Sequence, residues 1–372
     1  MSIVKFSDVA HRANTKEDRF NTDKIYYVGG EHIDSNELFV RSKGIIKGST
    51  IGPMFYCGFT SGQILFVTRN PHLRKCGIVD FDGICSEKTF VIESKDTTKL
   101  SQEYLAIIMQ SDEFWNYCEE NKSGGVNYFL NWSTLADYEF ELPPIQIQEE
   151  IAEKVMSAYR LKQSYQKLLT ATDEMIKSQF IEMLNTEGYE YLALGEVCSK
   201  ITDGSHNPPK GCDSSDYIMI SSKNISPDCL DLSDVRYLTK DEFESENKRT
   251  NVSANDILLT IVGTIGRTYL VKGNEGNIVM QRSVAVLTPN KNINPTFLMY
   301  SLLIDSELEK EGRGNAQKGV YLKQLAKFKV KIPSFKCQNK FCEIYNQADK
   351  SKFELRKSIE AIDAVIKNLI NG

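Results

Sequence analysis

The sequence predicts an α+β protein made of two strand-rich domains, each followed by a long helix. Three observations predict this fold class. The stretch ELPPIQIQEEIAEKV at 141–155 returns in outline as KIPSFKCQNKFCEIY at 331–345, at an offset of 190 residues. The residues before each stretch contain short β-branched or aromatic runs bounded by turn residues, a pattern typical of strands. The residues after each stretch repeat apolar positions every three or four residues, a pattern typical of a coiled-coil helix.

The internal repeat predicts the domain organisation. Its offset places Pro143 on Pro333 and Gln148 on Gln338 without a gap, whereas the match further upstream is loose. Because proline cannot extend a central strand and suits the first turn of a helix, each joint marks a switch from strand to helix. We expect strand-rich domains at 1–143 and 188–333 and helices at 144–187 and 334–372.

Within each domain the expected elements follow from local pattern. Two stretches carry a helical apolar period near the end of a domain, SQEYLAIIMQSDEFWNYCEE at 101–120 and PTFLMYSLLIDSELEKEG at 295–312. The runs that we expect to be strands are IYYVGG, GQILFV, KTFVIE, YIMISS, DILLTIVG, RSVAVL and KFKVKIP.

The two long helices carry matching heptad seams. Lys162 and Lys352 occupy the same seam position in the two helices. Either the lysine stem reaches from the seam toward solvent, or the lysine fixes the register of the pair. The apolar seam residues are Ile151, Val155, Tyr165, Leu169 and Ile176 in the first helix and Phe341, Tyr345, Leu355, Ile359, Ile362, Ile366 and Leu369 in the second.

Composition narrows the class of protein. A chain of 372 residues with 41% hydrophobic and 26% charged residues fits a globular protein of two or more domains. No apolar run approaches the ~18–20 residues of a membrane helix, so we expect a cytoplasmic protein without a membrane partner. Nine cysteines without a CxxC pair predict reduced, mostly buried thiols, and four isolated histidines predict no metal site.

Three further motifs complete the pattern: RNPHLRKCGIVDFDGICSEKTFVI at 69–92, ITDGSHNPPK at 201–210 and DILLTIVGTIGRTYLV at 256–271. Together with the repeated joint and the heptads, these motifs resemble the specificity (S) subunits of type I restriction–modification systems. The resemblance covers essentially the whole chain.

The resemblance implies a function and a set of partners. Each domain would be a target recognition domain that reads one half of a split double-stranded DNA sequence, and the two helices would pack antiparallel as a spacer. The chain itself would have no catalytic residue and bind no cofactor. Two modification subunits would methylate adenine with S-adenosylmethionine, and motor–nuclease subunits would use ATP and Mg²⁺.

DNA contact requires donors for phosphates and planar polar groups for base edges. The net charge of −5 is not that of a basic protein, but 310–331 is rich in lysine and holds one acidic residue. Glycine loops at 123–125 and 312–319 precede the two joints and could let backbone approach phosphate. The candidate residues are Arg41, Lys43, Lys47, Arg69, Asn70, His72, Arg74, Lys75, Lys122 and Asn127 in the first domain, and Ser205, His206, Asn207, Lys210, Lys223, Asn224, Arg267, Gln281, Arg282, Arg313, Asn315, Gln317, Lys318 and Tyr321 in the second.

Three other hypotheses stay open at this point. The chain could serve a type II-like restriction–modification enzyme, or act alone as a methyltransferase or as a nuclease. A methyltransferase loop would need an aromatic residue where Lys210 follows Asn-Pro-Pro, and the segment TKDEFESENKR after Pro227–Asp228 is too polar for a nuclease core strand. VGTIGR at 262–267 fits a tight turn between strands better than a phosphate-binding loop.

Overall fold

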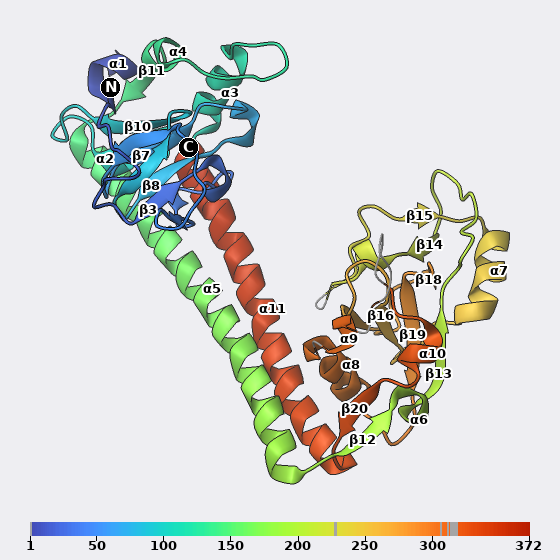
Figure 1. Ribbon diagram of the computed structural model, residues 1–372. Coiled ribbons are helices and arrows are strands. Elements are labelled where there is room, and N and C mark those ends of the chain that lie inside the picture. Colours follow the sequence, from blue (N-terminus) through green and yellow to red (C-terminus); the bar gives the residue numbers. More distant parts are fainter. Residues whose placement is uncertain (1, 227–228, 306, 311, 313–318) are drawn as a thin grey trace. The chain divides into compact units, whose positions relative to one another are not determined.

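The computed structural model describes residues 2–226, 229–305, 307–310, 312 and 319–372, of which residue 309 is described in its backbone only (Figure 1). The chain divides into two compact units. Unit 1 comprises Met1–Lys167 and Leu355–Gly372, and unit 2 comprises Leu168–Glu354. Each long helix therefore contributes one part to each unit.

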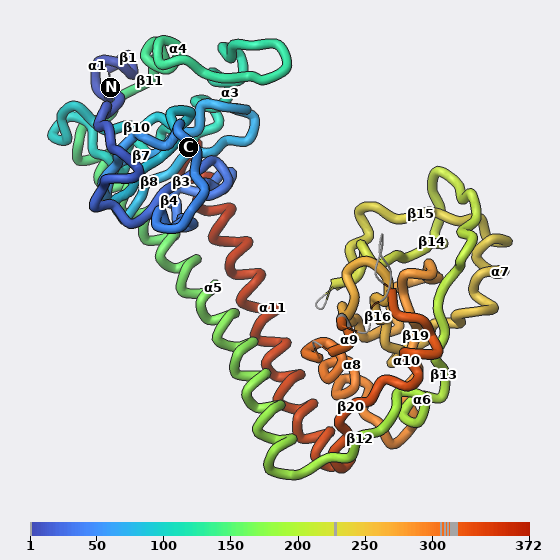
Figure 2. Tube along the Cα trace, in the orientation of Figure 1, coloured from blue at the N-terminus to red at the C-terminus, as the bar shows by residue number. Residues whose placement is uncertain are grey.

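The described residues of unit 1 form three sheets. The strand orders are β2-β10-β7-β8-β4, β5-β3-β9-β6 and β1-β11. In the third sheet the first strand of the unit pairs antiparallel with its last, which Figure 2 shows near the N-terminus. The strands are β1 (Ser2–Lys5), β2 (Ala10–Ala13), β3 (Tyr26–Val28), β4 (Phe39–Val40), β5 (Gly44–Ile45), β6 (Phe55–Phe59), β7 (Ile64–Val67), β8 (Cys76–Val79), β9 (Gly83–Ser86), β10 (Thr89–Ser94) and β11 (Glu139–Leu142).

Unit 2 repeats this topology in its described residues. Its strand orders are β13-β19-β16-β17, β15-β14-β18 and β12-β20, and the last pair again joins the first strand of the unit to its last. The strands are β12 (Glu190–Ala193), β13 (Cys198–Asp203), β14 (Tyr217–Ile220), β15 (Arg236–Tyr237), β16 (Ile257–Thr260), β17 (Thr268–Leu270), β18 (Asn277–Met280), β19 (Val284–Pro289) and β20 (Lys329–Ile332). All seven runs expected to be strands are confirmed.

The two units differ by additions to a shared plan. Both contain a parallel pair in the second sheet, β3 with β9 and β14 with β18. Unit 1 adds β4 and β6 at sheet edges, and unit 2 adds helix α7 (Lys240–Thr250). The sequence repeat is clear only near the joints, so the topology extends the equivalence to residues whose sequences have diverged.

Short helices close each unit. The stretch 101–120 is two helices rather than one, because Ser111 accepts a hydrogen bond from Phe114 N–H and starts a new helix. The helices of unit 1 are α1 (Phe6–Val9), α2 (Gln102–Ile108), α3 (Asp112–Glu120) and α4 (Trp132–Ala136), with single 3₁₀ turns η1 (Gly30–His32) and η2 (Pro71–Leu73). Those of unit 2 besides α7 are α6 (Leu194–Val197), α8 (Pro295–Ile304), α9 (Glu307–Lys310) and α10 (Leu322–Leu325), with η3 (Ser222–Asn224).

The joint of unit 1 depends on one buried glutamine. After β11 the chain enters the long helix α5 (Ile145–Glu187), and the Gln148 side chain is fully buried. Its Oε1 accepts the N–H of Ser101, the N-cap of α2, at 3.0 Å. Its Nε2 donates to the carbonyls of Lys99 and Pro143, both at 2.8 Å. The glutamine thus fastens the first turn of α5 to the start of α2 through backbone groups alone.

Unit 2 repeats the arrangement with Gln338 in the long helix α11 (Phe335–Asn371). Gln338 Oε1 accepts the N–H of Asn294, the N-cap of α8, at 2.8 Å. Its Nε2 donates to the Pro333 carbonyl at 3.0 Å. The two glutamines that the sequence repeat superposes therefore make equivalent hydrogen bonds at the two joints.

The long helices pack antiparallel, as the resemblance predicted. In unit 1 the early part of α5, with Val155 and Tyr159, packs in one core with Ile366 near the end of α11 (Figure 1). In unit 2 the late part of α5 packs on the early part of α11, with the rings of Phe180 and Phe341 5.0 Å apart. The buried seam follows the predicted heptad as far as Ile176, after which Phe180 and Leu184 take the buried positions.

The two seam lysines are buried and ion-paired. Lys162 Nζ lies 2.8 Å from Asp363 Oδ1 and 2.7 Å from Glu37 Oε1 in unit 1. Lys352 Nζ lies 2.6 Å from Asp173 Oδ1 in unit 2. Because the offset of 190 residues relates both the lysines and the aspartates, the two contacts are equivalent. Of the two interpretations of the seam lysine, the structure favours a paired polar residue over a stem that reaches solvent.

The cysteines match the expectation from their spacing. All nine are free, and six of them are buried. Among the described residues, no helix is long and apolar enough to cross a membrane. The same part of the chain holds no group of three or more metal-ligating side chains.

Candidate DNA interface

The first candidate surface in unit 1 joins two loops that are distant in sequence. Arg69 forms an isolated bridge with Phe129, and the Asn70 N–H donates to the Tyr128 carbonyl at 3.0 Å. The Arg69 guanidinium lies over the Phe129 ring, 5.5 Å from its centroid, and Lys122 Nζ lies 4.5 Å from that of Tyr128. We call the segments 69–72 and 122–129 the unit 1 loop surface.

The tip of this surface is open. Val126 is 91% exposed, and the neighbouring Asn127 is exposed as well. Gly124 has φ +99°, and a Cβ there would lie 2.6 Å from the Asn127 carbonyl oxygen, so the turn requires glycine. The glycine of the predicted loop therefore shapes a tight turn that presents Val126 and Asn127 to a ligand.

Two of the candidates beside this surface are engaged inside the protein. Arg74 Nη1 lies 2.5 Å from Asp112 Oδ1, and Lys75 Nζ donates to the Gly30 carbonyl at 2.6 Å. His72, in the 3₁₀ turn η2, is exposed. Of these three side chains, His72 alone bonds to no other described residue and is open to solvent.

A second basic segment of unit 1 surrounds β4 and β5. Arg41, Lys43 and Lys47 are all exposed. Lys43 Nζ lies 4.1 Å from the ring centroid of Tyr26 and 4.0 Å from that of Phe81. Aromatic rings hold this ammonium in place while leaving its hydrogen-bond donors open to solvent.

In unit 2 the structure brings four candidates into one pocket of about 420 Å³. The pocket lies between the loop after β13, the start of η3, β15 and the residue after β18. We call it the unit 2 pocket. Its lining residues are Lys210, Met219, Ser221, Lys223, Asn224, Asp234, Val235, Arg236 and Gln281.

Asn224 is a structural member of this pocket. It is 2% exposed, and its Oδ1 accepts the backbone N–H of Ser221 at 2.9 Å. Its Nδ2 donates to the carbonyls of Asp231 and Asp234, both at 2.9 Å. All of its strong hydrogen-bond positions are used, so Asn224 shapes the pocket and has no group left for a base edge.

The open polar groups of the pocket are on Lys210 and Gln281. Lys223 pairs with Asp234, and Arg236 donates to the Pro209 carbonyl. Lys210 is exposed and Gln281 is half-buried, and neither side chain bonds to another described residue. These two residues carry a positive charge and a planar amide, the kinds of group that contact phosphates and base edges in protein–DNA complexes.

The motif ITDGSHNPPK leads from β13 to Lys210, its one residue in the lining of the pocket, and its start packs closely on the backbone. A Cβ at Gly204 would lie 1.9 Å from the Met280 carbonyl oxygen, so only glycine allows the loop to leave β13 at this point. The carboxylate of Asp203, the residue before this glycine, pairs with Arg249 and lies 2.8 Å from His206 Nε2. Ser205 is buried and bonds through its backbone N–H, which makes it structural.

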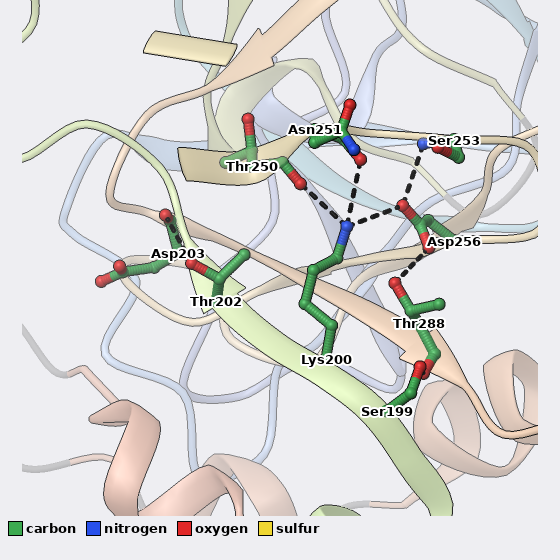
Figure 3. Close-up of polar contacts among 9 residues, drawn as sticks. All are labelled: Ser199, Lys200, Thr202, Asp203, Thr250, Asn251, Ser253, Asp256 and Thr288. Carbon is green, nitrogen blue, oxygen red and sulfur yellow. Dashed lines mark hydrogen bonds and ion pairs between the residues drawn. The ribbon is translucent and has the colours of Figure 1, made fainter. Parts of the chain in front are cut away.

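A buried charge network that the sequence did not reveal anchors α7 (Figure 3). Lys200 Nζ donates to the carbonyls of Thr250 and Asn251 at the C-terminal end of α7, at 2.9 and 3.0 Å. It also lies 3.5 Å from Asp256, which is 1% exposed and accepts Thr288 Oγ1. A cation at a helix C-terminus is favourable because it meets the unpaired carbonyls and the dipole.

The other end of α7 contacts the loop that carries Lys210 into the pocket. Glu242, in its first turn, accepts the N–H of Gly211 in the pocket loop at 3.2 Å. The backbone hydrogen bonds of Thr239 and Gly211 lower the pKa of Glu242. Helix α7 contains the polar segment that the nuclease hypothesis requires to be a core strand. It forms a helix instead, and its first turn supports the loop of Lys210.

The remaining candidates do not share one site. Arg267 is exposed and ends the tight turn between β16 and β17, which confirms the turn expected for VGTIGR. Asn207 and Arg282 are exposed, and Tyr321 is 71% exposed. Arg313, Asn315, Gln317 and Lys318 lie outside the described residues.

One protein family matches the chain twice. The family is described as "Type I restriction modification DNA specificity domain", and its model matches residues 3–170 and 186–363. Each match covers one strand-rich domain and much of the helix that follows it.

Curated relatives carry the same description. The EcoBI specificity subunit of Escherichia coli, a type I restriction enzyme subunit, is 28% identical over 277 residues, or 64% of this chain and 57% of that protein. A putative type I specificity subunit of Mycoplasma pneumoniae is 22% identical over 218 residues, or 56% of this chain and 54% of that protein. The chain spans about half the length of these curated relatives.

Two solved structures share the fold. The S subunit of a type I restriction–modification system from M. genitalium aligns with a TM-score of 0.61 at 13% identity, over 99% of this chain and 94% of that one. A chain from a study of assembly and conformational transition of the type I R-M system aligns with a TM-score of 0.52 at 18% identity, over 99% and 96%.

Proposed function

The chain belongs to the family of type I restriction modification DNA specificity domains, and from this membership we propose that it is the DNA specificity subunit of a restriction–modification complex. One observation carries the proposal. Two copies of one strand topology, each followed by a glutamine-fastened long helix, are what a chain needs to read two separate half-sites with one kind of module.

Each unit supplies one reading surface in this proposal. Lys122, which also pairs with Glu119 at 2.6 Å, and Lys210 are cations beside a loop surface and a pocket, where they would neutralise phosphates and set orientation. Asn127 and Gln281 carry amides suited to adenine edges, and Val126 offers an apolar contact suited to a thymine methyl group.

The chemistry belongs to partners. The chain would be non-catalytic and bind no cofactor, while two modification subunits supply adenine methylation with S-adenosylmethionine. Motor–nuclease subunits supply ATP- and Mg²⁺-dependent cleavage. The relatives are described as specificity subunits of type I enzymes, which supports this division of labour.

Selection of bound duplexes from a random library tests the proposal. The chain, together with its modification subunit, should enrich a sequence of two fixed half-sites separated by an unspecified spacer. The chain alone should neither methylate nor cut DNA when given S-adenosylmethionine, ATP and Mg²⁺. A continuous recognition sequence, or turnover by the chain alone, would contradict it.

A further inference from the structure

Each unit carries a hollow beside one pair of triplets that the repeat superposes, and the two hollows differ in charge. In unit 2 a hollow of about 760 Å³ is lined by Lys327, Phe328 and Lys329. In unit 1 a hollow of about 400 Å³ is lined by Asp137, Tyr138 and Glu139. The offset of 190 residues superposes these two triplets, each at the start of the last strand of its unit. We call them the basic hollow and the acidic hollow.

The charge difference extends beyond the triplets. Lys177 on α5 and Lys331 on β20 also line the basic hollow, so four lysines face two carboxylates, those of Asp305 and Glu307. The lining of the acidic hollow holds four carboxylates, with Glu113 and Glu120 on α3, and no lysine or arginine. At the positions that the repeat superposes, the charge is therefore reversed: Asp137 and Glu139 in unit 1 correspond to Lys327 and Lys329 in unit 2.

Three of the four lysines of the basic hollow form no ion pair within the described fold. Lys177, Lys327 and Lys329 make no ion pair with any described residue, and Lys331 lies over the rings of Tyr189 and Tyr191. In the acidic hollow, by contrast, Asp137 pairs with Lys5 at 3.3 Å. The basic hollow therefore has charge available for a ligand.

The floor of the basic hollow is apolar. Phe180 and Leu184 of α5 are buried beneath it, while Ile181 is 45% and Tyr191 is 56% exposed. A hollow of this size accepts several side chains, and a mainly apolar lining with a few charges is the usual composition of a site for a specific ligand. Duplex DNA offers phosphates but no side chain to fill such a floor, and its phosphates would meet Asp305 and Glu307.

We propose that the basic hollow of unit 2 binds an acidic protein segment that carries an apolar anchor residue, supplied by a partner subunit, and that the acidic hollow of unit 1 rejects the same segment. The proposal rests on the proposed function for the existence of such a partner. Two copies of one partner chain then make unequal contacts with the two units, so the repeat distinguishes its partners by charge.

Peptide binding tests this directly on the full chain. The probe is a short fluorescein-labelled peptide rich in glutamate with a central Leu-Phe pair, and binding is measured by fluorescence anisotropy. The double variant Lys327→Glu/Lys329→Glu should bind it at least about tenfold more weakly, since two favourable charge contacts become repulsive. A peptide with lysine in place of glutamate should not bind the unaltered chain.

The matched control is Lys272→Glu/Lys291→Glu, which makes the same change of charge at exposed positions of unit 2 outside the hollow. It should leave peptide affinity within about twofold. Both variants are also measured with a random-sequence duplex and with the selected target. Equal peptide affinity of the two variants overturns the proposal. So does loss of duplex binding without loss of peptide binding in the hollow variant, which would assign the hollow to DNA. Target selection in the same preparations reports separately on the proposed function.

Discussion

At the residue scale, the chain assigns its polar side chains to two different tasks. Gln148, Asn224 and Asp203 are buried, and their polar atoms are satisfied by backbone or by charged neighbours. Lys210 and Asn127 are exposed and bond to no described residue. Residues of the first kind fix loop shape, and residues of the second kind have polar groups open to a ligand, which in the proposed function is DNA.

Gln148 gives the first prediction. Gln148→Ala leaves the Ser101 N–H and the carbonyls of Lys99 and Pro143 without their partner in a buried joint, so unit 1 should lose about 2–4 kcal/mol of unfolding free energy. Both tryptophans of the chain, Trp115 and Trp132, belong to unit 1, so their fluorescence in urea reports this loss. Gln146→Ala, an exposed change one half-turn earlier, is the control. Equal urea midpoints for the two variants would show that Gln148 does not stabilise the joint.

Lys210 gives a prediction for binding. If it contacts phosphate, Lys210→Gln should weaken binding of specific and random duplexes alike and reduce the slope of log K against log salt concentration by about 0.9. Lys272→Gln, exposed in the same unit but outside the pocket, serves as the control. A slope that stays at the unaltered value in the Lys210 variant would exclude this lysine from the interface.

Cys57 gives a prediction for pH. The Cys85 thiol, opposite it on β9, donates a hydrogen bond that lowers the pKa of Cys57 to about 7; burial acts against this shift and Arg12 supports it. Alkylation of Cys57 by iodoacetamide should therefore rise with pH around a midpoint near 7, and Arg12→Gln should move the midpoint upward because a stabilising cation is lost. Mass spectrometry of the Cys57 peptide measures the rate, with Cys57→Ser as the blank. A midpoint near the ordinary ~8.5 would contradict the geometry.

These residues show which features of single side chains the sequence did not predict. The repeat picked out Gln148 and Gln338 but not their role, because the backbone groups to which they fasten the helix lie 44 to 49 residues away in the chain. Cysteine spacing predicted buried thiols, but the pairing of Cys57 with Cys85 depends on strand register. Asn224 looked like a base-reading residue because its burial is not visible in its local sequence.

At the element scale, the paired helices show a polar contact inside an apolar seam. Lys162 and Lys352 sit at one heptad position, and each meets an aspartate of the other helix. Burial lowers the pKa of Lys162, but its hydrogen bonds to Asp363 and Glu37 outweigh that effect and raise the pKa overall, so the ammonium stays charged. A charged group at a seam position disfavours alternative registers, because any shift would leave it buried without a partner.

The register hypothesis makes a charge-swap prediction. Lys162→Glu places a third carboxylate beside Glu37 and Asp363, so unit 1 should lose on the order of 2 kcal/mol or more. Adding Asp363→Lys should restore about half of that loss, because one favourable pair returns. Tryptophan fluorescence in urea again reports on unit 1, and Lys167→Glu, an exposed change on the same helix, is the control. No recovery in the double variant would show that the pair does not act as a unit.

The heptad itself was predictable in detail because it is a local periodicity. Val155, Ile176, Phe341 and Ile366 lie in the seam as expected. The end of the seam was not predictable in this way. Phe180 lies outside the expected heptad positions and is buried because it packs against Phe297 and Phe341 in the unit 2 core. Tertiary packing, rather than helix period, decides which face is buried at that end.

At the scale of the whole molecule, the repeat separates what must stay constant from what is free to change. Both units keep one plan of strand pairing, to which unit 1 adds β4 and β6, and the same glutamine joint, whereas their surfaces differ in charge and in loops. The glutamines bond only to backbone N–H and carbonyl groups, which every sequence of that fold supplies. The joint therefore places no demand on the side chains of the surfaces that we propose read DNA.

That independence predicts that a domain can be exchanged at the joint. Residues 1–142 are replaced by the first domain of another specificity subunit, and the present α5 supplies Gln148. The chimera should fold, because the counterpart of α2 in the incoming domain offers Gln148 the same backbone N–H and carbonyl groups. Target selection should then change one half-site and leave the other half-site unaltered, since the reading surface of unit 2 lies within 188–333 in the sequence. The same chimera with Gln148→Ala should lose stability as the unaltered chain does. A change in both half-sites in a folded chimera would contradict modular reading, and it would mean that the two units shape each other's surfaces through the helices they share.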